Sequence, residues 1–227
     1  ETIAQTFAQR GIQSLQSIFI DGSYFSSPVE IPGSTDEMDP YNAPVSALAA
    51  NFNTIFIEVH PDGSVTSKEP QTPITDFARS AAQKLKIRGV ARVNLGQNGI
   101  DYQLYPGYLL RAFLEHRGIP VRGEIRQKNV LSGLNLFYRH TCRESLEEIV
   151  RKMLKYSSNF MANQIFLTIG ARVFGPPATL EKGQKAVADF LNDILHIKQA
   201  TVVEGSGLSR MNQVSARQME RVLAYFL

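Results

Sequence analysis

The chain has 227 residues, a formal net charge of +3 and 43% hydrophobic residues. This composition excludes a disordered chain, and the single cysteine excludes a framework of internal disulfides. The sequence contains neither an apolar run of about 18 residues that could span a membrane nor a run of about five like charges that would indicate nucleic-acid binding. A chain of this length can bury enough surface for one large core or two smaller ones.

The first 140 residues mix helix and strand signals, with short apolar runs between turns rich in Gly, Pro and Asp. These patterns predict helices over residues 1–10, 77–85 and 107–116. They predict strands over residues 17–20, 54–59, 91–95, 102–105 and 121–125. Two irregular stretches, 26–44 and 64–75, are expected to be loops, and long ordered loops often carry function.

From Cys142 onward, apolar residues recur at the spacing of amphipathic helices. The pattern predicts helices over residues 146–154, 161–169, 180–194 and 215–227, and a short strand over 201–203. The sequence therefore predicts an α/β (α+β) protein. Its mixed region covers residues 1–140 and its mostly helical region covers residues 141–227.

Signals for metal, phosphate and thiol chemistry are weak. No two histidines are spaced as a metal-binding pair on a helix, and His140 and Cys142 lack two further ligands nearby in the sequence. Neither Gly-x-Gly-x-x-Gly nor the Walker pattern is present. We therefore expect no metal and no cofactor, and we expect Cys142 to be a buried free cysteine. A thiol hydrolase that uses Cys142 is a further alternative, but the sequence supplies no activating surroundings for that thiol.

The run Lys155-Tyr-Ser-Ser-Asn159 lies between two predicted helices. Ser and Asn are good helix N-caps, so plain capping explains the run. In a functional interpretation, the Ser157 hydroxyl relays a proton and the Asn159 amide holds a substrate carbonyl. Ser-x-Asn is one of three motifs found in penicillin-recognising serine enzymes. The triplet alone leaves both interpretations open.

Six segments resemble, in order, the D-alanyl-D-alanine carboxypeptidases of the low-molecular-mass class C penicillin-binding proteins. They include Met153-Leu-Lys-Tyr-Ser-Ser-Asn-Phe-Met-Ala-Asn-Gln-Ile-Phe166 and Val203-Glu-Gly-Ser-Gly-Leu-Ser-Arg210. The others span residues 19–25, 41–48, 107–114 and 118–124. The resemblance implies part of a penicillin-binding-protein/β-lactamase-like transpeptidase domain. Residues 1–140 would be an inserted mixed α/β domain, and residues 141–227 would be the helical part of the catalytic domain.

The resemblance also implies a reaction: acylation of a serine by the penultimate D-Ala of a peptidoglycan stem peptide, followed by hydrolysis. The activity would be that of a carboxypeptidase or an endopeptidase, and β-lactam antibiotics would acylate the same serine. Ser157 would pass a proton to the leaving D-Ala amine. Asn159 would hydrogen-bond the acyl side of the substrate.

Four further residues receive substrate-binding roles from the resemblance. Leu208 and Arg210 would line the cleft, where a guanidinium suits a stem-peptide carboxylate. Asp36 aligns, by its spacing to Ala43-Pro44, with an acidic residue that approaches the amino end of the stem. Tyr41 would lie nearby, and Asp39 is the rival of Asp36. For Asp36 and Arg210, a solvated loop charge is an equal alternative.

The sequence also departs from the family. No serine is followed three residues later by lysine, and neither Lys-Thr-Gly nor Lys-Ser-Gly is present. The resemblance therefore implies the interior of a longer enzyme of the periplasm or cell envelope, inactive on its own. The alternative is a non-catalytic binding or assembly domain of the same fold. We expect the helical region to expose an apolar face, so that the isolated chain forms a homodimer, aggregates or needs parts from another chain.

Overall fold

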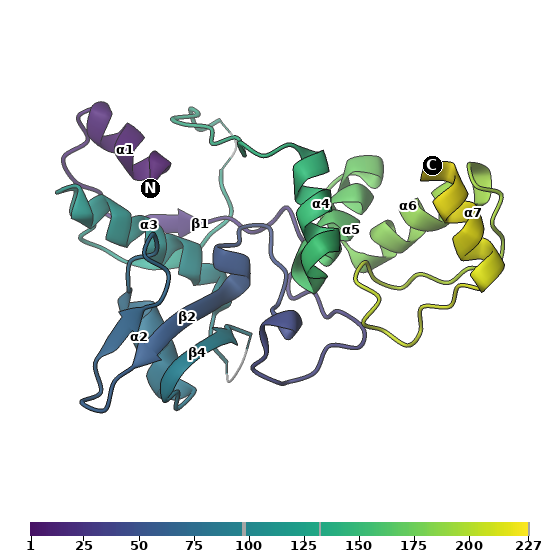
Figure 1. Cartoon of the computed structure of the whole chain (residues 1–227). Helices are drawn as coiled ribbons and strands as arrows, with labels where there is room; N and C mark the ends of the chain where they lie inside the picture. The colour runs from purple at the N-terminus through teal and green to yellow at the C-terminus, as the bar shows by residue number, and fades with distance from the viewer. Residues whose placement is uncertain (97–98, 132, 227) are drawn as a thin grey trace. The chain divides into compact units, whose positions relative to one another are not determined.

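The computed structural model describes residues 1–96, 99–131 and 133–226 (Figure 1). Its packing divides the chain into two compact units. The first comprises Glu1–Gly22, Glu37–Ala43 and Leu48–Glu144, and the second comprises Ser23–Asp36, Pro44–Ala47 and Ser145–Leu227. The last change of unit, at Glu144/Ser145, lies near the change of texture predicted at residue 141. The assignment of an inserted domain to 1–140 and of a catalytic domain to 141–227 stays a prediction.

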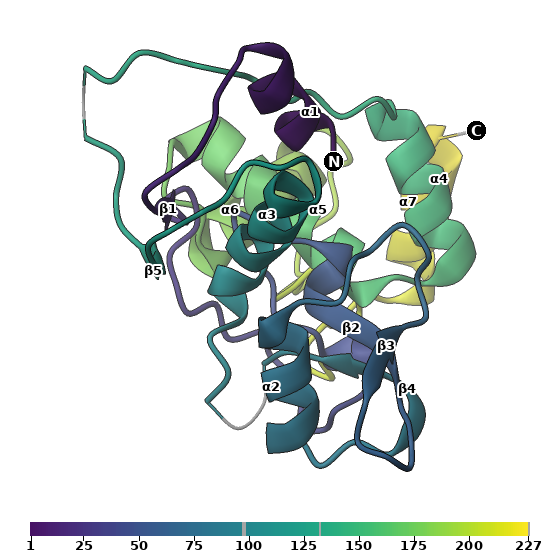
Figure 2. The same ribbon diagram turned by 90° about the vertical axis from the view of Figure 1, so that its left-hand side faces the viewer.

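The described residues of the first unit form two small sheets and three α-helices, which can be followed in Figure 2. A three-stranded antiparallel sheet has the order β3-β2-β4, and a two-stranded parallel sheet pairs β1 with β5. The strands are β1 (Ile18–Ile20), β2 (Thr54–Val59), β3 (Val65–Ser67), β4 (Gly89–Asn94) and β5 (Ile125–Gln127). The helices are α1 (Thr2–Gln9), α2 (Asp76–Lys84) and α3 (Tyr105–His116), with 3-10 turns η1 (Pro40–Asn42), η2 (Asn51–Asn53) and η3 (Tyr102–Leu104).

Helix α3 contributes to both apolar cores of the first unit. Its Leu109 packs with residues of β2, β4 and α2, and its Leu114 packs with residues of α1, β1 and β5. Tyr105, at the start of α3, is buried, and its ring stacks on Phe77 with the centroids 5.5 Å apart. Burial raises the pKa of the Tyr105 phenol to about 12. Each sheet of this unit is therefore covered by helix on its apolar face.

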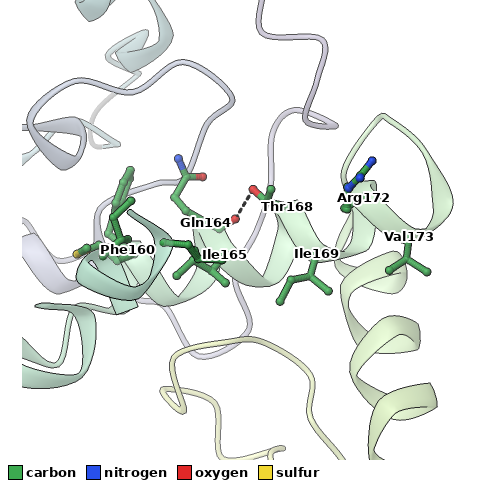
Figure 3. Close-up of a pocket in the computed structure, with 10 residues that line it drawn as sticks. Phe160, Gln164, Ile165, Thr168, Ile169, Arg172 and Val173 are labelled. Carbon is green, nitrogen blue, oxygen red and sulfur yellow. Dashed lines mark hydrogen bonds between the residues drawn. The ribbon is translucent and has the colours of Figure 1, made fainter. Parts of the chain in front are cut away.

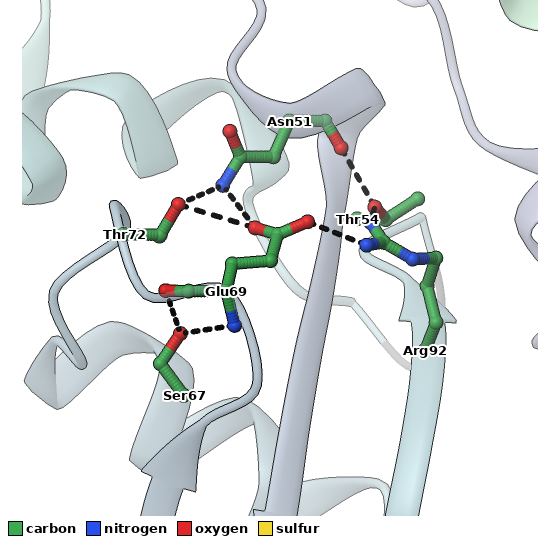
Figure 4. Close-up of polar contacts among 6 residues, drawn as sticks. All are labelled: Asn51, Thr54, Ser67, Glu69, Thr72 and Arg92. Atoms are coloured by element: carbon green, nitrogen blue, oxygen red, sulfur yellow. Dashed lines mark hydrogen bonds and ion pairs between the residues drawn. The ribbon is translucent and has the colours of Figure 1, made fainter.

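A left-handed turn at residues 51–53 is held by a polar network (Figure 4). The three residues have φ of 49°, 60° and 51°, a conformation that costs a residue with a side chain about 1–2 kcal/mol. The Asn51 amide donates to Glu69 at 2.9 Å and to the Thr72 hydroxyl at 3.1 Å, and Arg92 donates to the other Glu69 oxygen at 2.5 Å. These hydrogen bonds offset the strain and fix the entry into β2.

The second unit is built around helices α4 (Leu146–Tyr156), α5 (Asn159–Phe174), α6 (Leu180–Asp193) and α7 (Ala216–Phe226). A capping box of Ser145 and Glu148 begins α4. Helices α5 and α6 approach closely at two glycines, because a Cβ on Gly170 would lie 2.4 Å from the Gly183 nitrogen. The main buried cluster of this unit is small and consists of Phe25, Val45, Leu167, Ala171 and Ala178.

Most predicted elements are confirmed, three predictions are wrong, and one strand is displaced: the strand predicted over residues 121–125 is β5 at Ile125–Gln127, with an isolated bridge between Val121 and Leu15. Residues 102–105 form η3 and the start of α3, where Pro106 suits the first helical turn. The predicted loop 64–75 contains β3, which pairs with β2 across a tight turn. Instead of a strand at 201–203, the structure has a single bridge between Thr201 and Gln213. In the described part of the predicted helix 215–227, α7 spans Ala216–Phe226, and residue 227 lies outside the described residues.

The helices in the described ranges are too short or too polar to cross a membrane.

Candidate functional site

The Ser-x-Asn triplet occupies the junction between α4 and α5. Ser157 follows the last residue of α4 in a left-handed conformation, with φ 49° and ψ 47°. Ser158 is the N-cap of α5, and its hydroxyl accepts from the Met161 nitrogen at 3.3 Å. The exposed Ser157 hydroxyl makes no hydrogen bond to any residue that the structure describes. Ser158 thus caps the start of α5 with its side chain, and Ser157 caps the end of α4 through its backbone nitrogen, which donates to the Met153 carbonyl, so the Ser157 hydroxyl is available to a ligand.

Helix α5 also contacts the loop segment Gly205-Ser206-Gly207. The buried Asn163 side chain accepts from the Gly205 nitrogen at 2.7 Å. A Cβ on Gly205 would lie 2.6 Å from the Ala162 carbonyl oxygen, so only glycine allows the loop to come this close to the helix. Asn163 lies one turn beyond Asn159 on the same helix face. The loop that bears Leu208 and Arg210 is therefore attached to the helix that begins at Asn159.

A buried carboxylate lies at the centre of this loop. Glu204 is 1% exposed and accepts from the Ser206 nitrogen at 2.7 Å, the Ser206 hydroxyl at 2.5 Å, the Ser209 nitrogen at 3.2 Å and the Asn212 amide at 2.5 Å. Burial is the largest single influence on the pKa of Glu204, and by itself it would raise that pKa. The hydrogen bonds from Ser206, Ser209 and Asn212 together outweigh it and hold that pKa below its ordinary value. The loop is therefore organised around an ionised group.

The segment that carries Asp36 packs against the same loop. Gly33 has φ +90°, and a Cβ on it would lie 2.8 Å from the Ser209 Cα. Asp36 is exposed three residues further along, in the same unit as Leu208 and Arg210. Its rival Asp39 belongs to the first unit, where its carbonyl oxygen accepts from the Asn94 amide at 2.9 Å. Arg210 is exposed and Leu208 is half-buried.

Tyr41 belongs to the first unit. Its phenol donates to the Glu37 carboxylate at 2.8 Å, and this hydrogen bond raises the pKa of Tyr41 above its ordinary value. The structure thus brings the segments of Asp36, Asn159, Leu208 and Arg210 together in one unit, and it describes Tyr41 in the other.

Two hollows in the second unit differ in chemistry. An apolar cavity of about 460 Å³ lies along α4 and α5, where Phe160, Ile165, Ile169 and Val173 project into it (Figure 3). It contains none of the predicted site residues. An open hollow of about 570 Å³ borders the end of the Glu204 loop, and its lining, which includes Gln199, Asn212, Gln213 and Gln218, likewise contains none of the predicted site residues. Amide side chains both donate and accept, which suits a peptide backbone.

In the described part of the chain, no group of three or more His, Cys, Asp or Glu side chains is arranged to hold a metal ion. Cys142 is exposed, so the prediction of a buried cysteine is wrong. It lies in an extended segment between β5 and α4 that has few apolar contacts to bury a thiol.

Sequence reasoning missed the roles of Glu204 and Asn163. Both lie within segments that carry the family resemblance, but Asn163 is followed by Gln164 and Glu204 by Gly205-Ser206, so neither is a single polar residue in an apolar run. Only the fold shows that both side chains are buried, and a buried polar side chain needs hydrogen-bond partners.

The model of the D-Ala-D-Ala carboxypeptidase 3 (S13) family matches residues 1–227. The chain belongs to this family. A curated relative, the D-alanyl-D-alanine carboxypeptidase DacB of Haemophilus influenzae, is 27% identical over 212 residues, which cover 91% of this chain and 43% of that protein. This family membership agrees with the resemblance seen in the sequence.

Solved structures show the same fold. The crystal structure of penicillin binding protein 4 (dacB) from H. influenzae matches with a TM-score of 0.77 and 21% identity, covering 99% of this chain and 56% of that one. The same protein complexed with a novel β-lactam matches with a TM-score of 0.67 and 19% identity, covering 99% and 55%. The fold is thus an α/β fold of the penicillin-binding-protein type. The chain spans about half the length of the relatives that it matches.

Proposed function

We propose that these 227 residues form part of a serine-type D-alanyl-D-alanine carboxypeptidase, with endopeptidase activity as a variant, that acts on peptidoglycan stem peptides in the periplasm or cell envelope. The attacking serine and its lysine would lie on polypeptide beyond these residues, since no Ser-x-x-Lys is present here. Membership of the S13 family supports the reaction class. β-Lactams would bind as acylating analogues of the substrate.

Each site residue has a role in this proposal. Ser157 passes a proton to the leaving D-Ala amine, and the Asn159 amide hydrogen-bonds the acyl side of the peptide. Arg210 pairs with a peptide carboxylate and Leu208 lines the cleft beside it. Asp36 meets the amino end of the stem, with Tyr41 as a further contact.

One observation carries the proposal. The Ser157 hydroxyl is exposed without a hydrogen-bond partner among the described residues, and the Asn163–Gly205 hydrogen bond attaches the loop that continues to Leu208 and Arg210 to the helix that begins at Asn159. A junction that served only to cap helices would not need an attached loop with a cationic side chain. The arrangement suits a groove for a short anionic peptide.

Labelled penicillin and release of D-Ala from a pentapeptide test the proposal. We expect the 227-residue chain alone to stay unlabelled. The full-length protein encoded by the gene should be labelled with a stoichiometry of about one, as an acyl-serine mechanism requires. Ser157→Ala should lower the acylation rate by about a hundredfold, whereas Glu220→Gln on the exposed face of α7 should not change it.

A non-catalytic binding or assembly domain is the second candidate, and the lack of Ser-x-x-Lys in this chain favours it. It predicts a full-length protein that takes up no penicillin label and releases no D-Ala, yet sediments with purified peptidoglycan. Labelling of the full-length protein would contradict this candidate. Labelling of the 227-residue chain alone would contradict the carboxypeptidase proposal as stated.

A further inference from the structure

Glu204 is unusual because a carboxylate is almost never fully buried without a cationic partner. All of its hydrogen-bond partners are neutral donors, and they belong to the loop that Glu204 begins. Hydrogen bonds to an ionised group are about twice as strong as those between neutral groups. The loop therefore folds around its own anion.

The contacts of Glu204 enclose the two residues with proposed roles in peptide binding. One carboxylate oxygen holds Ser206, and the other holds Ser209 and Asn212. Leu208 and Arg210 flank Ser209 directly. Gly207 has φ +78°, a left-handed turn that lets the chain curve back towards the carboxylate. The direction in which Leu208 and Arg210 project thus depends on the Glu204 hydrogen bonds.

The base of the loop has separate attachments. Gly205 is bonded to Asn163 on α5, and the Val203 carbonyl accepts from Gln184 on α6 at 2.9 Å. On the loop, these two hydrogen bonds use main-chain atoms, and neither involves the Glu204 carboxylate. Loss of the Glu204 charge should therefore disturb residues 206–210 while the loop stays attached to both helices.

We propose that Glu204 is a positioning residue, whose buried carboxylate fixes the arc of residues 206–210 so that Arg210 and Leu208 meet the peptide. This rests on the proposed function. In Glu204→Gln, one acceptor oxygen becomes an NH₂ donor that faces donors of the loop. The side chain keeps its shape, but the network is no longer complementary.

Steady-state release of D-Ala by the full-length protein tests the role. We expect Glu204→Gln to raise KM by about tenfold and to change kcat by less than about threefold, because the loop binds substrate and does not take part in proton transfer. Glu220→Gln makes the same chemical change at an exposed position of the same unit and should leave both constants unchanged. Equal KM values for the two variants would overturn the proposal.

A double-mutant cycle with Arg210→Ala separates positioning from general destabilisation. If Glu204 acts through Arg210, then Arg210→Ala raises KM about tenfold in the wild type and less than about twofold in Glu204→Gln. If the two substitutions instead have additive effects on KM, and Glu204→Gln and Arg210→Ala lower the melting temperature equally, Glu204 only stabilises the fold.

Ser206→Ala keeps the test decisive if Glu204→Gln is insoluble. It removes one hydroxyl donor from the carboxylate and leaves the main-chain donors in place. We expect a KM rise of about threefold, and an unchanged KM overturns the proposal. A wild-type protein without D-Ala release or penicillin labelling would contradict the proposed function itself. An active wild type with an unaffected Glu204→Gln contradicts only this inference.

Discussion

The two units of the chain stabilise their helices differently. In the first unit, α1, α2 and α3 all bury residues against the two sheets. In the second unit, α5 and α6 bury residues against each other, whereas α4 and α7 bury none. The helices of the first unit are thus all packed, and its exposed apolar run lies outside them, at Val130, Leu131, Leu134 and Leu136, whereas the second unit presents apolar helix faces to solvent.

The exposed faces of the second unit are large. On α4, Leu146 and Leu154 are 67% and 69% exposed, and on α7, Leu223 and Phe226 are 59% and 72% exposed. Soluble proteins rarely leave such apolar stripes uncovered unless they serve as contact surfaces. The predicted site residues other than Tyr41 lie in this same unit, where hydrogen-bonded loops supply order that a small core does not.

Removal of a core leucine should show the largest difference between the units. Leu114 of α3 is 0% exposed, so Leu114→Ala should lower the free energy of unfolding by about 3 kcal/mol through lost burial and the cavity left behind. Leu154→Ala, the same change on α4, should lower it by less than about 0.5 kcal/mol. Urea unfolding followed by circular dichroism measures both. Similar losses for the two variants would show that α4 is packed in solution.

Charges on the exposed faces should reduce self-association of the isolated chain. Leu154→Glu and Leu223→Glu place carboxylates within the apolar stripes of α4 and α7, and we expect each to weaken association by about tenfold or more. Sedimentation velocity over a range of concentrations measures this. Val90→Glu, at an exposed apolar position on β4 of the first unit, is the matched control and should have no effect. A wild-type chain that stays monomeric at high concentration would contradict the prediction.

Acid should weaken the Glu204 loop. The pKa of Glu204 is lowered in the folded state, so its contribution to stability is complete above its ordinary pKa of about 4.3 and is lost as the pH falls through the folded value. The free energy of unfolding should therefore fall more steeply in the wild type than in Glu204→Gln as the pH drops below about 4.3. Other carboxyls with lowered pKa values, such as Glu148 and Glu181, are common to both proteins and cancel in the difference. Parallel pH profiles would contradict an ionised Glu204.

Elements with a strong local pattern could be predicted from the sequence. The strand at Thr54–Val59 was predicted with its observed bounds, because Thr-Ile-Phe-Ile-Glu-Val is a β-branched and aromatic run that ends at a turn. The helices of the second unit follow from their apolar spacing. In contrast, the short strand β3 exists because β2 lies beside it, and a three-residue run carries no signal of that pairing.

The candidate site divides in the same way. The segments that carry Ser157, Asn159, Leu208 and Arg210 could be identified from residue types and their order along the chain. The Asn163–Gly205 hydrogen bond and the burial of Glu204 could not, since both arise where a loop crosses a helix from another part of the sequence. The roles of Ser157, Asn159, Leu208, Arg210, Asp36 and Tyr41 stay predictions.

The smallest effect concerns the conformation of Ser157, and it distinguishes a functional from a structural serine. A non-glycine residue at φ 49° is strained, so Ser157→Gly should raise the free energy of unfolding by about 1 kcal/mol, whereas Ser157→Ala keeps the strain and should leave it nearly unchanged. Both variants lack the hydroxyl and should slow penicillin acylation of the full-length protein to the same extent. A serine retained at the expense of stability indicates that its hydroxyl serves the groove and not the helix junction. If Ser157→Gly is less stable than Ser157→Ala, the left-handed conformation is not the source of strain, and the structural argument for a functional hydroxyl is lost.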